Sequence, residues 1–130
     1  MVSQDPFPIL DAAGANGIGT PIYVRDFEHL IAALNTTGTT TATIKFQVSY
    51  QKERPNFAAA QSPTNQWDYV RVVDLEDGSA IAGDTGIALS GADDNRNLEV
   101  DVNAATWFCA IISGYSQGAI HLDATPVAND

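Results

Sequence analysis

Residues 41–49 read TATIKFQVS, and this stretch decides the class of fold. Apolar and polar side chains alternate along it without a break. The apolar set is Ala42, Ile44, Phe46 and Val48. Because successive side chains of a β-strand point to opposite faces, a period of two predicts a strand that buries one face.

Three further segments carry strand patterns. Residues 67–75 and 98–102 alternate, whereas residues 106–112 are apolar at nearly every position. The last pattern predicts a central strand covered on both faces. The side chains expected in the core are Ile44, Phe46, Val73, Val100, Trp107, Cys109 and Ile111. With a further strand near the C-terminus and frequent glycine-bearing turns, this predicts an all-β chain, an antiparallel β-sandwich or jelly-roll-like single domain.

Residues 26–34 allow two interpretations. Phe27, Leu30, Ile31 and Leu34 fall at helical spacing, with Asp26 as a possible cap. The segment then runs into a threonine-rich turn and the strand 41–49, which favours a hairpin and therefore a strand. The local pattern slightly favours the helix, and the context favours the strand.

The first twenty residues read differently from the rest. They hold two prolines and three glycines and show little periodicity. This composition predicts an extended N-terminal arm over 1–20, followed by the sandwich domain over 21–130. We expect the arm to lie against a neighbouring molecule rather than its own domain, with Phe7 and Ile9 as contacts.

The overall composition excludes several classes of partner. The chain has 130 residues, 45% of them hydrophobic, and a net charge of −10, so one domain with one core is expected. Contacts to phosphate need Lys and Arg, so neither nucleic acid nor an anionic membrane is an expected partner. A single cysteine makes no internal disulfide, and the N-terminus lacks the pattern of a secretion signal. These features predict a soluble protein made inside the cell.

No arrangement of residues predicts catalysis. The turns rich in Asp and Gly around 74–84 and 91–94 do not have the ligand spacing of an EF-hand. The two histidines, His29 and His121, are far apart in sequence, and no nucleophile motif is present. We therefore expect no catalytic, cofactor-binding or metal-binding residue, and a protein that is not an enzyme.

The segment 55–66 is a long loop between two strand-like segments. A loop of this length in a small domain is commonly functional or packed against a surface. It carries Pro55, Phe57 and Pro63 and leads into Trp67, so we expect these four residues to contact a partner protein. The alternative is a carbohydrate-binding module with Trp67, Tyr69 or Tyr115 as its aromatic platform.

Residues 40–120 resemble the small β-sandwich structural proteins of tailed bacteriophages, which decorate or cement the capsid exterior. The resemblance is carried by the strand ending in Gln47-Val48-Ser49, by SPTNQWDYV at 62–70, by GDTGIAL at 83–89, and by SGYSQGAI at 113–120 after the Trp107 strand. Residues 1–20 take no part in it.

The resemblance implies a role but no chemistry. A protein of this kind would bind the major capsid protein or other virion proteins, commonly as a homotrimer, and reinforce the assembled head. It would be made in the bacterial host cytoplasm and end on the virion. The family has no catalytic residues to transfer to this chain, and a stiff, acidic β-domain is compatible with the role.

Overall fold

Residues 2–3 and 6–128 are described by a computed structural model, and their regular structure is entirely β. The strands are β1 (Val2–Ser3), β2 (Phe7–Ala13), β3 (Gly17–Ile18), β4 (Ile22–Tyr23), β5 (His29–Thr37), β6 (Thr41–Ser49), β7 (Asp68–Tyr69), β8 (Val72–Asp74), β9 (Ala80–Ile81), β10 (Ile87–Leu89), β11 (Asn95–Asp101), β12 (Trp107–Ser116) and β13 (Ala119–Ala128). The described residues contain no helix with the length and apolar character that a membrane crossing requires.

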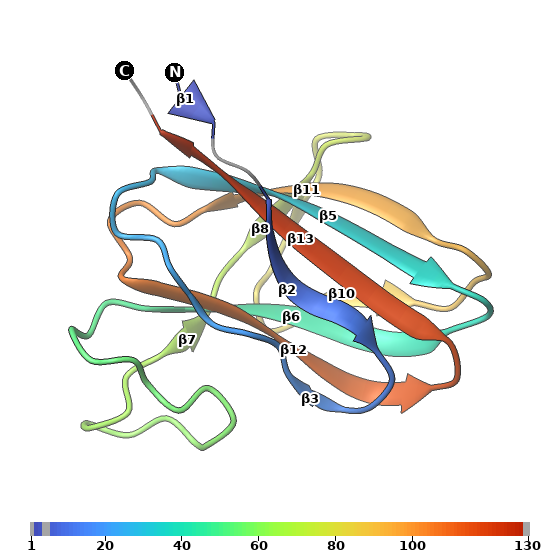
Figure 1. Ribbon diagram of the computed structural model, residues 1–130, viewed down its shortest axis with the longest axis horizontal. Helices are drawn as coiled ribbons and strands as arrows, with labels where there is room; N and C mark the ends of the chain where they lie inside the picture. The colour runs from blue at the N-terminus through green and yellow to red at the C-terminus, as the bar shows by residue number, and fades with distance from the viewer. Residues whose placement is uncertain (1, 4–5, 129–130) are drawn as a thin grey trace.

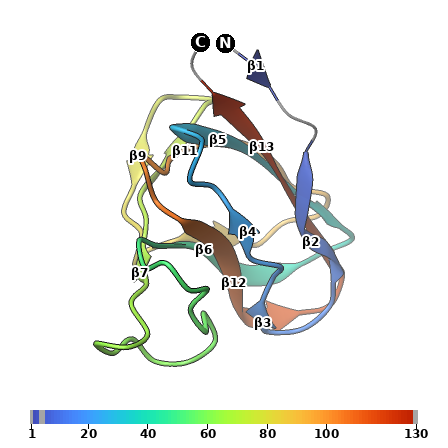
Figure 2. The same ribbon diagram turned by 60° about the vertical axis from the view of Figure 1, so that its left-hand side comes forward.

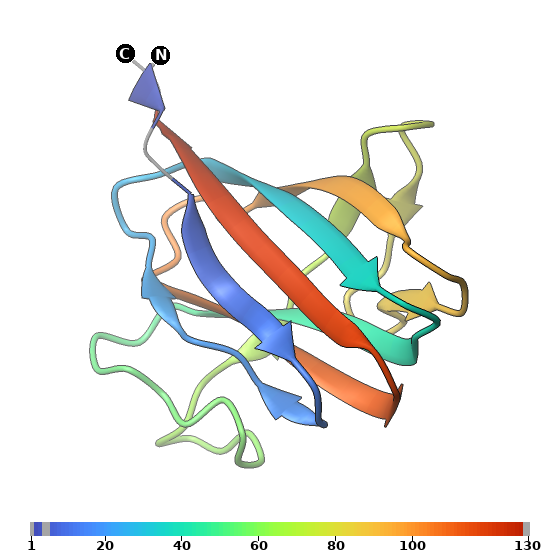
Figure 3. The same cartoon turned by 45° about the vertical axis from the view of Figure 1, so that its right-hand side comes forward.

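The strands form two antiparallel sheets that lie face to face (Figure 1). The first sheet has the order β1-β13-β5-β11-β8-β9, and β2 also pairs with β13. The second has the order β10-β6-β12-β3, with β4 on β12 and β7 on β6. Figure 3 shows the first sheet crossing in front of the second, with both chain ends at one corner. The predicted antiparallel β-sandwich is confirmed.

The core lies between the two sheets and follows the alternation in the sequence. The inward side chains of the three long central strands β5, β6 and β12 include Leu30, Ala32, Leu34, Ile44, Phe46, Phe108, Ala110 and Ile112, which are all at most 2% exposed. Phe46 and Phe108 stack across the β6–β12 pair, with ring centroids 6.0 Å apart. Large apolar residues at every second position therefore fill the space between the sheets.

The ambiguous segment 26–34 is a strand, not a helix. β5 pairs with both β11 and β13 in the middle of the first sheet. Leu30, Ala32 and Leu34 alternate inward. The two neighbouring strands satisfy the backbone hydrogen-bonding groups of β5, and this pairing outweighs the local helical spacing. The expected hairpin is wrong, because β5 and β6 belong to different sheets and the threonine-rich turn carries the chain across the sandwich.

The predicted strand 67–75 is divided in two. β7 pairs with β6 in the second sheet, whereas β8 pairs with β11 in the first. Between them, the Val70 amide donates to the Phe46 carbonyl at 2.9 Å, and the chain then crosses to the other layer. An uninterrupted alternation in the sequence can thus be shared between two sheets.

Four of the seven expected core residues are fully buried: Ile44, Phe46, Val100 and Cys109. The prediction is wrong for Val73, Trp107 and Ile111, which are half-buried on outer faces. Their neighbours Val72, Phe108 and Ile112 point inward instead. Strands that are apolar on both faces do not reveal which face meets the core.

The N-terminal segment is part of the sandwich, which corrects the predicted arm over 1–20. β2 pairs with β13, and β3 with β12, so residues 7–18 contribute to both sheets. Ile9 and Leu10 are 2% and 3% exposed within the core cluster. Burying these two side chains against the chain's own strands removes the need for a neighbour. Residues 1, 4 and 5 lie outside the described residues.

Candidate binding surface

The loop between β6 and β7, residues 50–67, covers the outer face of the second sheet. Phe57 is only 1% exposed, and its carbonyl accepts a hydrogen bond of 3.0 Å from the buried Gln47 side chain of β6. Cys109 of β12, opposite Gln47 in the register, is also fully buried although it points away from the main core. The loop lies on the side of the molecule away from the chain ends (Figure 2). We call residues 50–67 the covering loop.

Side-chain amides hold the covering loop in shape. The Asn65 side chain accepts from the Asn56 amide at 2.8 Å and donates back to the Asn56 carbonyl at 2.9 Å. The Trp67 indole N–H donates to the Ala59 carbonyl at 3.0 Å, and the Gln66 amide donates to the Gln51 side chain at 2.8 Å. These bonds satisfy loop backbone groups that would otherwise depend on water, so the loop forms an ordered surface.

A cleft of about 470 Å³ lies between the end of β6 and the covering loop. Its lining includes Val48, Tyr50, Gln61, Gln66, Trp67 and Asp68. Trp67 and Val48 supply apolar surface, whereas the other side chains supply amides, a phenol and one carboxylate. Small-molecule sites commonly have about 300–1,000 Å³ and mix apolar walls with a few polar groups, so this cleft has both the size and the character of a binding site.

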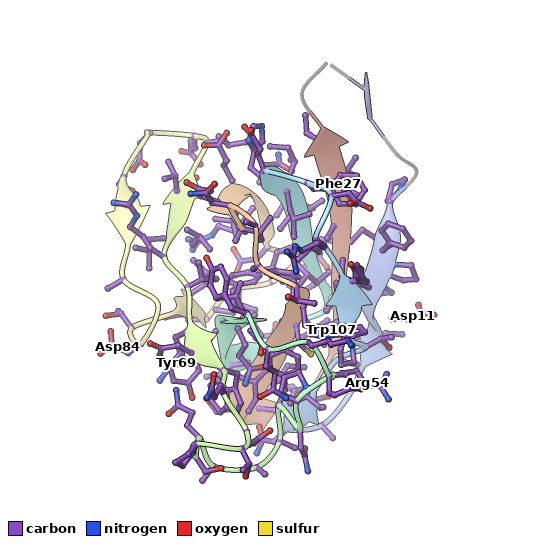
Figure 4. All side chains as sticks on the ribbon, turned by 90° about the vertical axis from the view of Figure 1, so that its left-hand side faces the viewer. Asp11, Phe27, Arg54, Tyr69, Asp84 and Trp107 are labelled. Carbon is purple, nitrogen blue, oxygen red and sulfur yellow. The ribbon has the colours of Figure 1, made fainter. Side chains whose placement is uncertain are left out.

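Aromatic side chains surround the covering loop. Trp67 packs edge-on against Tyr69 with ring centroids 5.1 Å apart, and the Lys45 ammonium lies 5.1 Å from the Tyr69 ring centre. On β12, Trp107 makes a second edge-on pair with Tyr23 at 5.5 Å. Figure 4 looks onto this side of the molecule and labels Trp107 and Arg54 towards its right and Tyr69 towards its left.

The six residues predicted to contact a partner are not equivalent. Ile9, Pro55 and Phe57 are buried within the chain, so they offer no surface to a partner, and the expected exposure of Phe57 is wrong. Phe7 is 39% exposed on β2, Pro63 is exposed, and Trp67 is half-buried at the cleft. Phe57 is buried because the loop folds back onto the sheet, which the sequence of the loop alone does not show.

The three residues considered for an aromatic platform do not all lie together. Trp67 and Tyr69 are neighbours at the covering loop. Tyr115 lies near the β12–β13 turn, where its hydroxyl donates to the Gly118 carbonyl. Tyr115 is thus a structural residue of that turn and is not grouped with the other two.

Carboxylates of the acidic turns accept hydrogen bonds from amide and hydroxyl groups of turn residues. Asp77 accepts from the amide and hydroxyl of Ser79 at 2.9 and 2.7 Å, and these bonds lower the pKa of its carboxyl. Asp93 accepts from the Gly38 amide at 2.9 Å. Among the residues that the structure describes, no three His, Cys, Asp or Glu side chains are grouped as metal ligands. The carboxylates of these turns therefore act as turn residues.

The remaining reactive side chains have structural positions. Burial raises the pKa of the Cys109 thiol to about 11, and the thiol donates to the Gly19 carbonyl at 3.5 Å. His121 accepts from the Ala12 amide at 3.3 Å and so joins β2 to β13. A thiol held neutral in the protein interior is a poor nucleophile.

Sequence reasoning missed most of the cleft. Tyr50, Gln61 and Gln66 were not among the predicted contact residues, although Gln61 and Gln66 flank Pro63. A clustering of Asn and Gln within a proline-bearing loop was the available signal, because amide side chains can cap loop backbone and also face a ligand.

Two solved structures share the fold along almost the whole chain. The SPBc2 prophage-derived protein YomS superposes with a TM-score of 0.71 at 12% identity, covering 98% of this chain and 96% of YomS. The PBSX exported protein XepA gives a TM-score of 0.71 at 16% identity, covering 97% of this chain but only 38% of XepA. Neither a protein-family model nor a curated protein sequence matches the chain. At these identities the likeness establishes the fold.

Proposed function

We propose that this chain is a non-enzymatic structural protein of a bacteriophage particle, and that it decorates or cements the assembled capsid. The observation that carries the proposal is the end-to-end likeness to YomS, a protein named as prophage-derived. The resemblance of residues 40–120 to small phage structural proteins supports the same role. A sandwich stiffened by a packed covering loop suits a protein that binds other proteins and performs no chemistry.

The covering loop is the surface proposed for the capsid contact. Residues 45–69 hold three of the six basic side chains, Lys45, Lys52 and Arg54, and only two of the sixteen acidic ones. The rest of the chain carries the whole net negative charge, so this is the face that meets a neutral or acidic partner with the least repulsion. Exposed Pro63 and half-buried Trp67 add apolar area there.

The first test is the location of the protein. Particles released from the bacterium that encodes the chain are purified by density gradient and analysed by mass spectrometry and by immunogold labelling. The proposal expects the protein in intact particles, with the label on the head. Particles that contain no trace of it would contradict a virion role, and a label confined to the tail would contradict the capsid assignment.

The second test concerns the surface. Purified protein is added to particles lacking it, and co-sedimentation is measured for Arg54→Glu and for Arg71→Glu. Both arginines are exposed, and both changes alter the net charge equally, but only Arg54 belongs to the covering loop. Binding should fall for Arg54→Glu and persist for Arg71→Glu. Equal binding by both variants would remove the covering loop as the contact.

A further inference from the structure

We propose that the cleft between residues 48–50 and 61–68 is a binding site for a neutral saccharide. This is a further function of the covering loop, so a saccharide would compete with the capsid contact proposed above. The apolar part of the cleft is made by Trp67 and Val48, with Tyr50, 63% exposed, at the side. A pyranose ring has one face made of C–H groups, and such a face packs well on an indole or phenol ring.

The polar side chains of the cleft are arranged to accept hydrogen bonds. The Gln61 side-chain NH2 donates to the Trp67 carbonyl at 2.7 Å and to the Asp68 carboxylate at 3.3 Å. The Gln66 side-chain NH2 donates to the Pro63 carbonyl at 2.9 Å. In the described part of the chain, the side-chain oxygens of both glutamines are left without a protein partner, and Asp68 contributes a carboxylate. A ligand that matches this lining has many donors, as a polyol does.

The charges select a neutral ligand. Residues 45–69 carry a net charge of +1 as a whole, but Asp68 is the charged residue among the described residues that line the cleft, and none of them is a Lys or Arg. An acidic sugar would bring a second carboxylate close to Asp68 in a partly dehydrated site, which costs binding free energy. Neutral hydroxyl donors meet no such repulsion.

The cleft is already formed in the free chain. The Trp67 indole is held by its hydrogen bond to the Ala59 carbonyl. It also packs against Tyr69 and Phe57, with ring centroids 5.1 and 6.3 Å from the centroid of the indole. The Asn65 bonds hold the adjoining loop. Since these side chains are ordered before binding, the entropy lost on binding is small.

Tryptophan fluorescence provides the test, because only one of the two tryptophans lines the cleft. In a Trp107→Phe background, Trp67 is the sole reporter. The probes are methyl glucoside, methyl galactoside, N-acetylglucosamine and lactose, with glucuronic acid as the acidic comparison. At least one neutral probe should shift the emission saturably, and glucuronic acid should bind about tenfold more weakly, which is about 1.4 kcal/mol. A purified bacterial surface polysaccharide, added as competitor, distinguishes a polymer-borne sugar from a free one.

Two matched variants locate the binding. Tyr50→Ala and Gln61→Ala change exposed side chains of the cleft and should each lower the affinity at least several-fold. Tyr23→Ala changes a tyrosine of similar exposure, 49%, outside the cleft and should leave affinity unchanged. The proposal is overturned if no neutral probe gives a saturable shift, or if Tyr50→Ala and Tyr23→Ala bind alike. Saturable binding of a basic peptide in place of sugars would also overturn the saccharide proposal. None of these outcomes affects whether the protein is detected in phage particles, so the two proposals can fail independently.

Discussion

Gly19 shows at the scale of one residue how closely the N-terminal segment is packed. A Cβ at this position would lie 2.3 Å from the Ile9 carbonyl oxygen and 2.8 Å from the Leu10 side chain. The backbone of β2 cannot move away without breaking the hydrogen bond of 2.8 Å that the Thr20 amide donates to the Ile9 carbonyl. We expect Gly19→Ala to lower the free energy of unfolding by about 1–3 kcal/mol, as overpacking does, measured by chemical denaturation.

Gly14 is the matched control in the same segment. A Cβ there would meet only the Tyr115 hydroxyl at 3.5 Å, an ordinary contact. Gly14→Ala should change the free energy of unfolding by less than about 0.5 kcal/mol. If Gly19→Ala were equally harmless, residues 7–20 would behave as a detachable arm, and their assignment to the sandwich would be wrong.

Cys109 gives a second residue-scale expectation, in its pH dependence. Its thiol has a pKa of about 11 in the folded protein because burial disfavours the thiolate, against a usual 9.0. A folded pKa raised above the unfolded one contributes stability that is complete below pH 9 and lost as the pH rises towards 11. Over that range the wild type should lose more stability than Cys109→Ala, by on the order of 1 kcal/mol.

Denaturant unfolding of both proteins at the two ends of that range measures the difference. Each protein is compared with itself, so the small cavity left by the alanine cancels. Parallel pH profiles would mean that the thiol is not held neutral. Rapid alkylation of Cys109 in the native protein at neutral pH would contradict the burial directly.

At the scale of an element, the covering loop depends on Phe57. Its side chain is buried outside the main core cluster, beneath the loop that carries it. We expect Phe57→Ala to release the loop while the two sheets stay paired. The amides of Asn56, Ser62 and Asn65 report on the loop, because each donates a hydrogen bond within it. Their hydrogen exchange should become at least tenfold faster, which corresponds to a decrease of about 1.4 kcal/mol in the free energy of local opening.

Phe7→Ala provides the control, since it removes the same side chain from a position that is 39% exposed. Exchange of the loop amides should be unaffected by it. Exchange in β6 and β12 should remain slow in both variants, because those strands are held by each other across the centre of the second sheet. Loop amides that stay protected in Phe57→Ala would show that the amide side chains alone hold the loop.

Individual elements show how far the sequence predicts this fold. β6 is predictable because one face is apolar and the other polar, so its period of two is unmistakable. β5 is not, because its helical spacing is overruled by pairing with β11 and β13, strands far away in the sequence. The cleft is harder still to predict, because Tyr50 and Gln61 lie eleven positions apart in a loop whose path depends on the burial of Phe57, and Trp67 alone stands out in the sequence.

At the scale of the whole molecule, repulsion among carboxylates opposes folding. There are sixteen acidic and six basic side chains, so ten carboxylates would be left over even if every Lys and Arg paired with one. Arg96 and Asp74 show how modest such a pair is here, with 3.9 Å between their charged atoms. Salt shortens the range of the repulsion from about 30 Å at 0.01 M to about 10 Å at 0.1 M. The melting temperature should therefore rise by several degrees over this range, measured by calorimetry.

A variant with fewer charges separates screening from general salt effects. Asp101 and Asp123 are exposed on β11 and β13 of the first sheet, which faces away from the covering loop. Neutralising both in Asp101→Asn/Asp123→Asn removes two of the sixteen acidic charges. The melting temperature in low salt should rise, and its further increase with salt should be smaller than in the wild type. A melting temperature that fell with salt would mean that attraction between the basic covering loop and the acidic remainder outweighs the repulsion.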